Sequence, residues 1–209
     1  MFQYLSQDPK RLQSLQQTMT IQPRGQPWFT VFPFKQEIAS FSGDTIFVDL
    51  GAGFGHQSAA LLGAHPELAG KIVVEDLKET LDTTPPLPEG IKSVAHDFFT
   101  EQPIKNAKFY YLRQVLHDWP DDKSIEILTH IRNALGPDSR LLIDEAVVPN
   151  SGAHQHAAGI DIIMLSCLGA IERTESEWHD LLSRAGFKIK GIHTYNTRRQ
   201  NSVIEAVPL

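Results

Sequence analysis

The pattern of apolar and polar residues changes period repeatedly from residue 45 to the C-terminus. Short runs rich in β-branched and aromatic residues alternate with segments whose apolar residues recur every three to four positions. This alternation is typical of βαβ units and predicts an α/β fold with a doubly wound, mostly parallel sheet. The predicted strands are residues 45–50, 71–75, 91–95, 108–112, 140–147, 188–193 and 202–207.

Two of the intervening helices have ends that can be assigned from local signals. Residues 121–135 carry one apolar stripe and stop at a Gly-Pro pair, which cannot continue a helix. Residues 174–185 begin with the capping box Thr174-x-x-Glu177. No helical pattern separates the last two strands, so we expect them to pair as an antiparallel hairpin at one edge of the sheet.

The N-terminal part of the chain has a different composition. Residues 1–40 are Gln-rich and predict a helical segment followed by a connector, ahead of the α/β domain over residues 41–209. The helix would start at Asp8-Pro9 and carry an apolar stripe. Residues 23–33 hold three prolines and a tryptophan, which favours an ordered, irregular connector over a flexible linker.

Composition narrows the classes of partner and location. The 209 residues include 19 Lys and Arg against 25 Asp and Glu, a net charge of −6 at pH 7, with no basic stripe to match nucleic acid. The apolar runs fall far short of the roughly 18 residues that cross a membrane. A single cysteine, Cys167, and the lack of a secretory signal in residues 1–10 predict a cytoplasmic protein.

A glycine loop follows the first predicted strand. Gly51-Ala52-Gly53-Phe54-Gly55 joins that strand to a helical pattern, an arrangement in which a ligand can approach the helix N-terminus. His56 occupies the third glycine position of a dinucleotide fingerprint, which disfavours an NAD-dependent dehydrogenase. The loop also lacks the Lys-Ser/Thr ending of a P-loop. A turn that serves packing alone is the other interpretation.

Three further candidates follow the next strands. Asp76 ends the second strand, where a carboxylate can bind the two ribose hydroxyls of a nucleoside. Asp97 and Phe98 follow the third and offer a carboxylate and an aromatic face, although a loop or cap role is equally compatible with this Asp. His117 follows the fourth strand, at the edge of a doubly wound sheet where ligands bind. With a pKa near 6.5, a histidine can take up a proton at neutral pH.

The sequence predicts no metal site. His154-x-His156 lies among Gly, Ala and Gln residues without an acid at ligand spacing. We find no cluster of two Asp and one Asn that could hold Mg²⁺ through oxygen ligands. The apolar helix over residues 160–168 could line a substrate pocket or pack in the core.

The combined motifs resemble the plant and fungal small-molecule O-methyltransferases, which use S-adenosylmethionine. Besides the glycine loop and the acids after the second and third strands, the resemblance rests on Leu-His-Asp-Trp-Pro-Asp at residues 116–121, Asp-Glu at 144–145 and Glu-Arg-Thr at 172–174. It runs from about residue 4 to the C-terminus. It implies a seven-stranded, Rossmann-like class I methyltransferase fold with one reversed edge strand.

The resemblance assigns seven residues to the cofactor. Three glycines would line its methionine part, the acid after the second strand would hold the ribose, and the Asp-Phe pair would hold the adenine. An arginine after the fourth strand would occupy the place of a basic residue near the cofactor. In this order they are Gly51, Gly53, Gly55, Asp76, Asp97, Phe98 and Arg113.

The resemblance also implies the catalytic groups. His117 would be the general base that deprotonates a hydroxyl of an aromatic or polyketide-like small molecule, because a phenol with a pKa near 10 is a poor nucleophile until it loses its proton. Glu145 and Glu172 would flank and orient this base. Without the resemblance, a strand-end residue and a surface residue would be the preferred interpretations of these two acids.

Members of this family usually carry an additional helical N-terminal domain that dimerises and forms a wall of the substrate pocket. Because this sequence starts near the point where that domain would end, we expect a homodimer or a heteromeric partner chain. Two other functions stay open: a subunit that binds the cofactor or a partner without methylating, and a cofactor-assisted isomerase or cyclase in which the sulfonium acts as a fixed charge.

Overall fold

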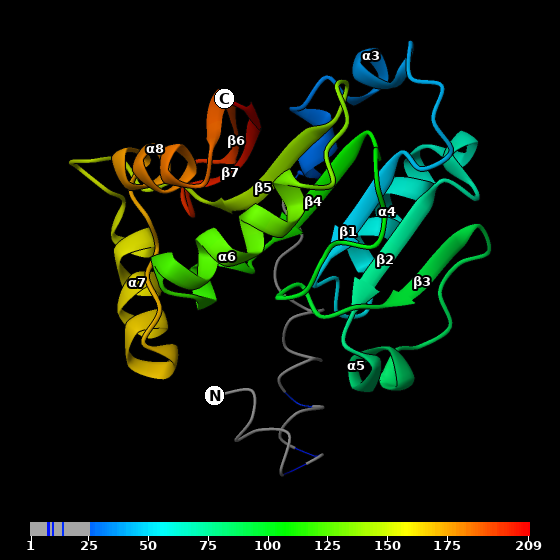
Figure 1. Ribbon diagram of the computed structural model, residues 1–209. Coiled ribbons are helices and arrows are strands. Elements are labelled where there is room, and N and C mark those ends of the chain that lie inside the picture. The colour runs from blue at the N-terminus through cyan, green and yellow to red at the C-terminus, as the bar shows by residue number, and fades with distance from the viewer. Residues whose placement is uncertain (1–7, 9, 11–13, 15–25) are drawn as a thin grey trace.

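The computed structural model describes residues 8, 10, 14 and 26–209 (Figure 1). The apolar stripe of the predicted N-terminal helix lies outside these residues. Within the described part, seven strands form one sheet in the order β3-β2-β1-β4-β5-β7-β6. The strands are β1 (Phe47–Leu50), β2 (Ile72–Asp76), β3 (Ile91–Ala95), β4 (Phe109–Arg113), β5 (Arg140–Ala146), β6 (Phe187–Asn196) and β7 (Asn201–Pro208).

The sheet confirms the predicted fold class and all seven strands, with ends that differ by at most three residues. Strands β1 to β5 pair in parallel, and β7 runs antiparallel to both β5 and β6. The reversed strand therefore lies one position inside the edge and is not itself the edge strand. The hairpin returns β7 between β5 and β6, so that β6 forms the outer edge.

Helices connect the strands. They are α3 (Phe34–Ile38), α4 (His56–Ala64), α5 (Lys78–Thr83), α6 (Asp121–Arg132), α7 (Gln155–Leu168) and α8 (Glu175–Arg184), with 3₁₀ turns η1 (Trp28–Thr30), η2 (Pro66–Leu68) and η3 (Leu116–Asp118). Helix α6 ends three residues earlier than predicted. The capping box of α8 is confirmed, because the hydroxyl of Thr174 accepts from the Glu177 N–H and the Glu177 carboxylate accepts from the Thr174 N–H.

Successive strand residues point to opposite faces of the sheet, which creates two apolar layers. Val48 and Tyr110 point toward α6 and α8, which lie in front of the sheet in Figure 1. Phe47 and Phe109 point to the other face, where they pack with residues of α4 and with the segment that precedes β1. Both faces of the central strands are thus covered, as a parallel sheet requires.

The segment before β1 packs into the second of these layers. Trp28 is 1% exposed, and its ring stacks on Tyr111 at 4.8 Å and on Phe47 at 5.7 Å between ring centroids. Phe32 and Phe34 are buried beside it. These contacts pack the described part of the predicted connector, residues 26–33, against the core.

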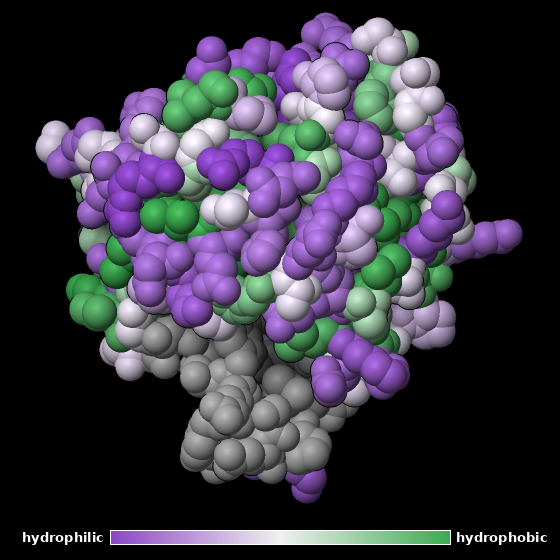
Figure 2. Space-filling model, in the orientation of Figure 1, coloured by the Kyte–Doolittle hydropathy of each residue, from purple (hydrophilic) through white to green (hydrophobic). Residues whose placement is uncertain are grey.

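The surface of α7 is unusually apolar. Ile162 is 66% exposed and Leu165 is 60% exposed. Figure 2 shows a largely hydrophilic surface with apolar atoms reaching it in several places, including the region where Figure 1 places α7. The sequence left two roles open for this helix, lining a substrate pocket or packing in the core. Its exposed residues do not pack in the core.

Among the described helices, none is long and apolar enough to cross a membrane.

We expect Trp28→Ala to lower the free energy of unfolding by about 3–5 kcal/mol, because it removes a fully buried indole and leaves a cavity between Phe47 and Tyr111. Urea denaturation followed by circular dichroism measures this change. Leu77→Ala is the control, since Leu77 is 49% exposed and its truncation should change stability by less than about 0.5 kcal/mol. Equal effects of the two substitutions would show that the segment does not stabilise the domain.

Candidate active site

The glycine loop lies at the carboxyl end of β1, where it leads into α4. Gly53 has φ +56°, and a Cβ added there would meet no atom within 4 Å. Gly55, with φ +66°, is the N-cap of α4. Left-handed backbone at these positions favours glycine, and the space in front of Gly53 leaves room for a ligand near the start of the helix.

Asp76 holds this loop against the end of β2. One oxygen of its carboxylate accepts from the Gly53 N–H at 2.7 Å, and the other accepts from the Leu77 N–H at 2.8 Å. Each carboxylate oxygen has a second lone pair that can accept from a hydroxyl. Asp76, the residue predicted to bind the ribose, is therefore in direct contact with the glycine loop predicted to bind the methionine part of the cofactor.

Phe98 and Asp97 follow β3 at the same edge. A Cβ on Gly51 would lie 3.5 Å from the Phe98 ring, so this ring borders the loop. Its other neighbours are the rings of Phe99 at 5.1 Å and Trp119 at 6.1 Å, both in edge-to-face geometry. Asp97 is exposed, and its carboxylate accepts from the Phe99 N–H at 3.0 Å.

Arg113 ends β4 and is fixed by an ion pair. Its guanidinium donates to the buried carboxylate of Asp144 at 2.7 Å and to the Tyr195 hydroxyl at 3.2 Å. Asp144 also accepts from the hydroxyls of Tyr111 and Tyr195. The structure places Arg113 at the expected edge of the sheet, but with its charge already paired.

The predicted base and its two acids meet in one buried cluster. His117 lies in η3 and is 8% exposed. Its Nδ1 is 3.0 Å from an oxygen of Glu172 and 3.6 Å from Oε2 of Glu145, and its Nε2 is 3.6 Å from Asp118. Glu145 stands at the end of β5, and Glu172 precedes α8, so the fold joins three distant segments at this point.

Opposing effects set the charge of His117. Burial alone would lower its pKa, but the charge of Glu145, the hydrogen bond and charge of Glu172 and the charge of Asp118 together raise that pKa to about 9. Burial raises the pKa of Glu145 to about 7, against the lowering effect of the His117 charge. Burial likewise raises the pKa of Asp118. The cluster therefore has a strong affinity for protons.

Glu145 and Val115 connect this cluster to the glycine loop. The Oε1 atom of Glu145 accepts from the N–H groups of Val115 at 2.9 Å and Leu116 at 3.0 Å, which fixes the backbone just before His117. The side chain of Val115 in turn packs against the loop, since a Cβ on Gly51 would lie 3.0 Å from its Cγ2. The two halves of the predicted site are thus neighbours.

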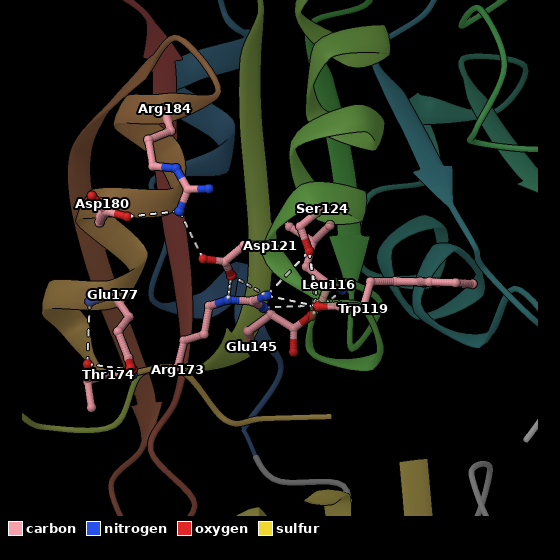
Figure 3. A network of polar contacts seen from close by, with 10 residues as sticks. All are labelled: Leu116, Trp119, Asp121, Ser124, Glu145, Arg173, Thr174, Glu177, Asp180 and Arg184. Atoms are coloured by element: carbon pink, nitrogen blue, oxygen red, sulfur yellow. Dashed lines mark hydrogen bonds and ion pairs between the residues drawn. The ribbon is translucent and has the colours of Figure 1, made fainter. Parts of the chain in front are cut away.

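Arg173, the middle residue of the Glu-Arg-Thr motif, positions the segment that carries His117. It is 1% exposed, and Figure 3 shows its guanidinium directed at the η3 segment. The guanidinium donates to the carbonyl oxygens of Leu116 and Trp119 at 2.9 Å each, and to Asp121 at 2.9 and 3.1 Å. Because Glu172 is the chain neighbour of Arg173, these contacts fix the position of Glu172 relative to His117.

A family model described as the O-methyltransferase domain matches residues 7–188. The chain belongs to this family. It is 41% identical over 210 residues to demethylsterigmatocystin 6-O-methyltransferase of Aspergillus parasiticus, covering 100% of this chain and 54% of that protein. It is also 41% identical over 206 residues to the enzyme of that name from Emericella nidulans, covering 98% of this chain and 100% of the relative. The chain thus spans about half the length of the first relative and all of the second.

Solved structures of methyltransferase-like proteins have the same fold. A structure of LepI in complex with SAM superposes with a TM-score of 0.90 at 33% identity, covering 100% of this chain and 55% of that one. A second structure, described as a pericyclic reaction enzyme, gives the same values. These similarities agree with the resemblance inferred from the motifs.

We expect Arg173→Lys to lower the free energy of unfolding by about 3 kcal/mol, because a lysine cannot satisfy two buried carbonyl oxygens and Asp121 together. Arg184→Lys is the matched control. Arg184 pairs with the same Asp121 carboxylate but is exposed, so its replacement should leave stability close to that of the wild type. Thermal unfolding of both variants measures the difference, and equal midpoints would contradict the positioning role of Arg173.

Proposed function

We propose that this chain transfers a methyl group from S-adenosylmethionine to a hydroxyl of an aromatic or polyketide-like small molecule, with His117 as the general base. The observation that carries the proposal is the buried contact of His117 with Glu145 and Glu172, next to the glycine loop. Membership of the O-methyltransferase domain family and the names of the relatives support it.

The residues at the carboxyl edge of the sheet fit such a cofactor. Gly53 leaves open space, Asp76 offers lone pairs for the ribose hydroxyls, and the Phe98 ring offers an apolar face for the adenine. We assign Gly51, Gly55 and Asp97 to the same site, with Arg113 beside it. When bound, S-adenosylmethionine supplies an electrophilic methyl group on a sulfonium.

His117 is oriented for one direction of proton transfer. If its Nδ1–H donates to Glu172, the neutral ring presents Nε2 as the acceptor for the proton of a substrate hydroxyl. His117 would take up the hydroxyl proton at Nε2 and so leave the substrate oxygen free to accept the methyl group that the bound cofactor would supply. The negative charges of Glu145 and Glu172 then stabilise the imidazolium that forms.

Two adjoining cavities support a place for the acceptor. A cavity of about 840 Å³ lies between the first half of α7 and the β6–β7 turn. A smaller one borders Glu172, and both are lined in part by Ile160 and Arg199. The larger cavity falls within the usual range for small-molecule sites. We assign it to the acceptor, whose hydroxyl would approach His117 past Glu172.

We expect Asp76→Asn to weaken the binding of S-adenosylhomocysteine by roughly 10–100-fold, because the substitution removes a charged hydrogen-bond acceptor for the ribose and loosens the glycine loop. Isothermal titration calorimetry measures this affinity. Asp82→Asn is the control, since Asp82 is exposed on α5 and pairs with Lys78. Wild-type affinity in the Asp76 variant would remove this residue from the cofactor site.

We expect kcat/KM of the wild type to rise about tenfold per pH unit from about pH 7 to a plateau near pH 9. Only the neutral imidazole accepts a proton, and the raised pKa of about 9 keeps His117 protonated below that value. Initial rates of methyl transfer across this range measure the profile. His117→Ala should lower kcat by about 10²–10⁴-fold and flatten the slope.

The control for this prediction is His179→Ala on the exposed surface of α8, which should keep both the rate and the pH slope. Binding of S-adenosylhomocysteine to His117→Ala shows whether the cofactor site survives the substitution. A variant that binds normally and retains both rate and slope would exclude His117 as the base.

One observation favours a second candidate function, a rearrangement without methyl transfer. A structural neighbour with a TM-score of 0.90 is described as a pericyclic reaction enzyme. A His117 that is protonated at neutral pH could donate a hydrogen bond to a substrate carbonyl instead of accepting a proton. Product mass separates the two functions, since methylation adds one methyl group and rearrangement leaves the mass unchanged.

A partner chain is a further proposal. The apolar residues Ile162, Ile163 and Leu165 on α7 are each more than half exposed, which suits a surface that another copy or another protein covers. A subunit that only binds the cofactor within a complex would need that partner and would show no turnover alone. Turnover by the purified chain would exclude this alternative.

A further inference from the structure

The geometry of the acid–histidine cluster points to a metal site that the sequence analysis did not predict. We propose that a divalent transition-metal ion, such as Zn²⁺, binds Nδ1 of His117 together with one carboxylate oxygen each from Glu145 and Glu172. Metal binding itself does not depend on the proposed function, whereas its inhibitory effect does.

Two of the three distances between these atoms are close to those around a tetrahedral ion. Nδ1 of His117 is 3.0 Å from the Glu172 oxygen and 3.6 Å from Oε2 of Glu145, and all three atoms lie within 4.8 Å of one another. Zinc bonds to nitrogen and oxygen are about 2.0–2.2 Å long, which places neighbouring ligand atoms roughly 3.3–3.6 Å apart. Shifts of a few tenths of an ångström would therefore bring the distances from Nδ1 to the two carboxylate oxygens into this range.

An unsatisfied buried oxygen supplies independent support. Glu145 is 1% exposed, and its Oε2 has no hydrogen-bond partner among the residues that the structure describes. This oxygen faces Nδ1 of His117, while the other oxygen of Glu145 is held by the N–H groups of Val115 and Leu116. A buried carboxylate oxygen without a partner is costly, and a cation in front of it would relieve that cost.

The charge balance also favours a dication. Three carboxyl groups, those of Asp118, Glu145 and Glu172, face one imidazole. An ion of charge +2 balances the two carboxylates of the proposed ligand set around a neutral imidazole, and the Asp118 carboxyl group lies outside this set. One imidazole nitrogen with two carboxylates suits zinc and similar ions, whereas Mg²⁺ and Ca²⁺ prefer oxygen ligands alone.

Space for a fourth ligand lies beside the cluster. A cavity of about 20 Å³ is bordered by Glu172, Gln114 and Asn201. This volume is enough for about one water molecule, and the amide side chains offer it hydrogen bonds. The cavity therefore has room for a water molecule beside Glu172, which could serve as the fourth ligand.

The test is isothermal titration of the chelator-treated chain with ZnCl₂ alone, without cofactor or acceptor. We expect one ion per chain, and His117→Ala should weaken its affinity by at least about tenfold. The control is His154→Asn with His156→Ala. This pair removes the surface histidines that could hold zinc adventitiously and retains an N-cap residue for α7, so the wild-type affinity should persist.

Glu172→Gln is the second ligand variant. It preserves side-chain volume, so it tests the site even if His117→Ala fails to fold. Thermal unfolding establishes which variants are folded. Unchanged zinc affinity in a folded His117→Ala or Glu172→Gln variant, or its loss in the surface variant, would overturn the proposal, as would no binding to the wild type. With an active enzyme, Zn²⁺ should inhibit methyl transfer and a chelator should restore it. Zinc binding without methyl transfer would leave the metal site standing and contradict the proposed function alone.

Discussion

The active-site geometry depends on the buried guanidinium of Arg173. A charge at 1% exposure is tolerated only when its donors are satisfied, and here the backbone carbonyls of Leu116 and Trp119 and the carboxylate of Asp121 satisfy them. The same contacts attach the start of α6 to the start of α8 (Figure 3). The stacking of Arg173 over Trp178 at 5.3 Å extends this connection into the main apolar core.

Several buried acids lie near the carboxyl ends of the parallel strands. Burial raises the pKa of Asp49 to about 7 despite its hydrogen bond from Ser58, and burial raises that of Glu75 to about 7 despite its hydrogen bond from Gln102. Those of these acids that ionise attract cations. A sulfonium cofactor, an imidazolium at His117 and a divalent metal ion are all cations, which links the proposed function to the proposed metal site.

The same electrostatics set a compromise at His117. The acids that orient the imidazole also raise its pKa to about 9, so its base form is scarce at neutral pH but strong when present. This affinity suits the proposed deprotonation of a phenol, whose ordinary pKa is near 10. In its proposed role as base, His117 would seldom be neutral near pH 7 but would bind a proton tightly when it is.

The sequence by itself determined the strands, the start of α6, the capping box of α8 and the glycine loop, because periodicity, caps and left-handed turns are encoded within short segments. Its motifs also indicated His117, Glu145 and Glu172 through family resemblance. Only the tertiary structure decided that these three meet, that Arg173 joins their segments, that β7 lies between β5 and β6, and that the apolar stripe of α7 is largely exposed. Each of these depends on contacts between residues far apart in the chain, where burial and charge pairing are settled by what the whole fold brings together.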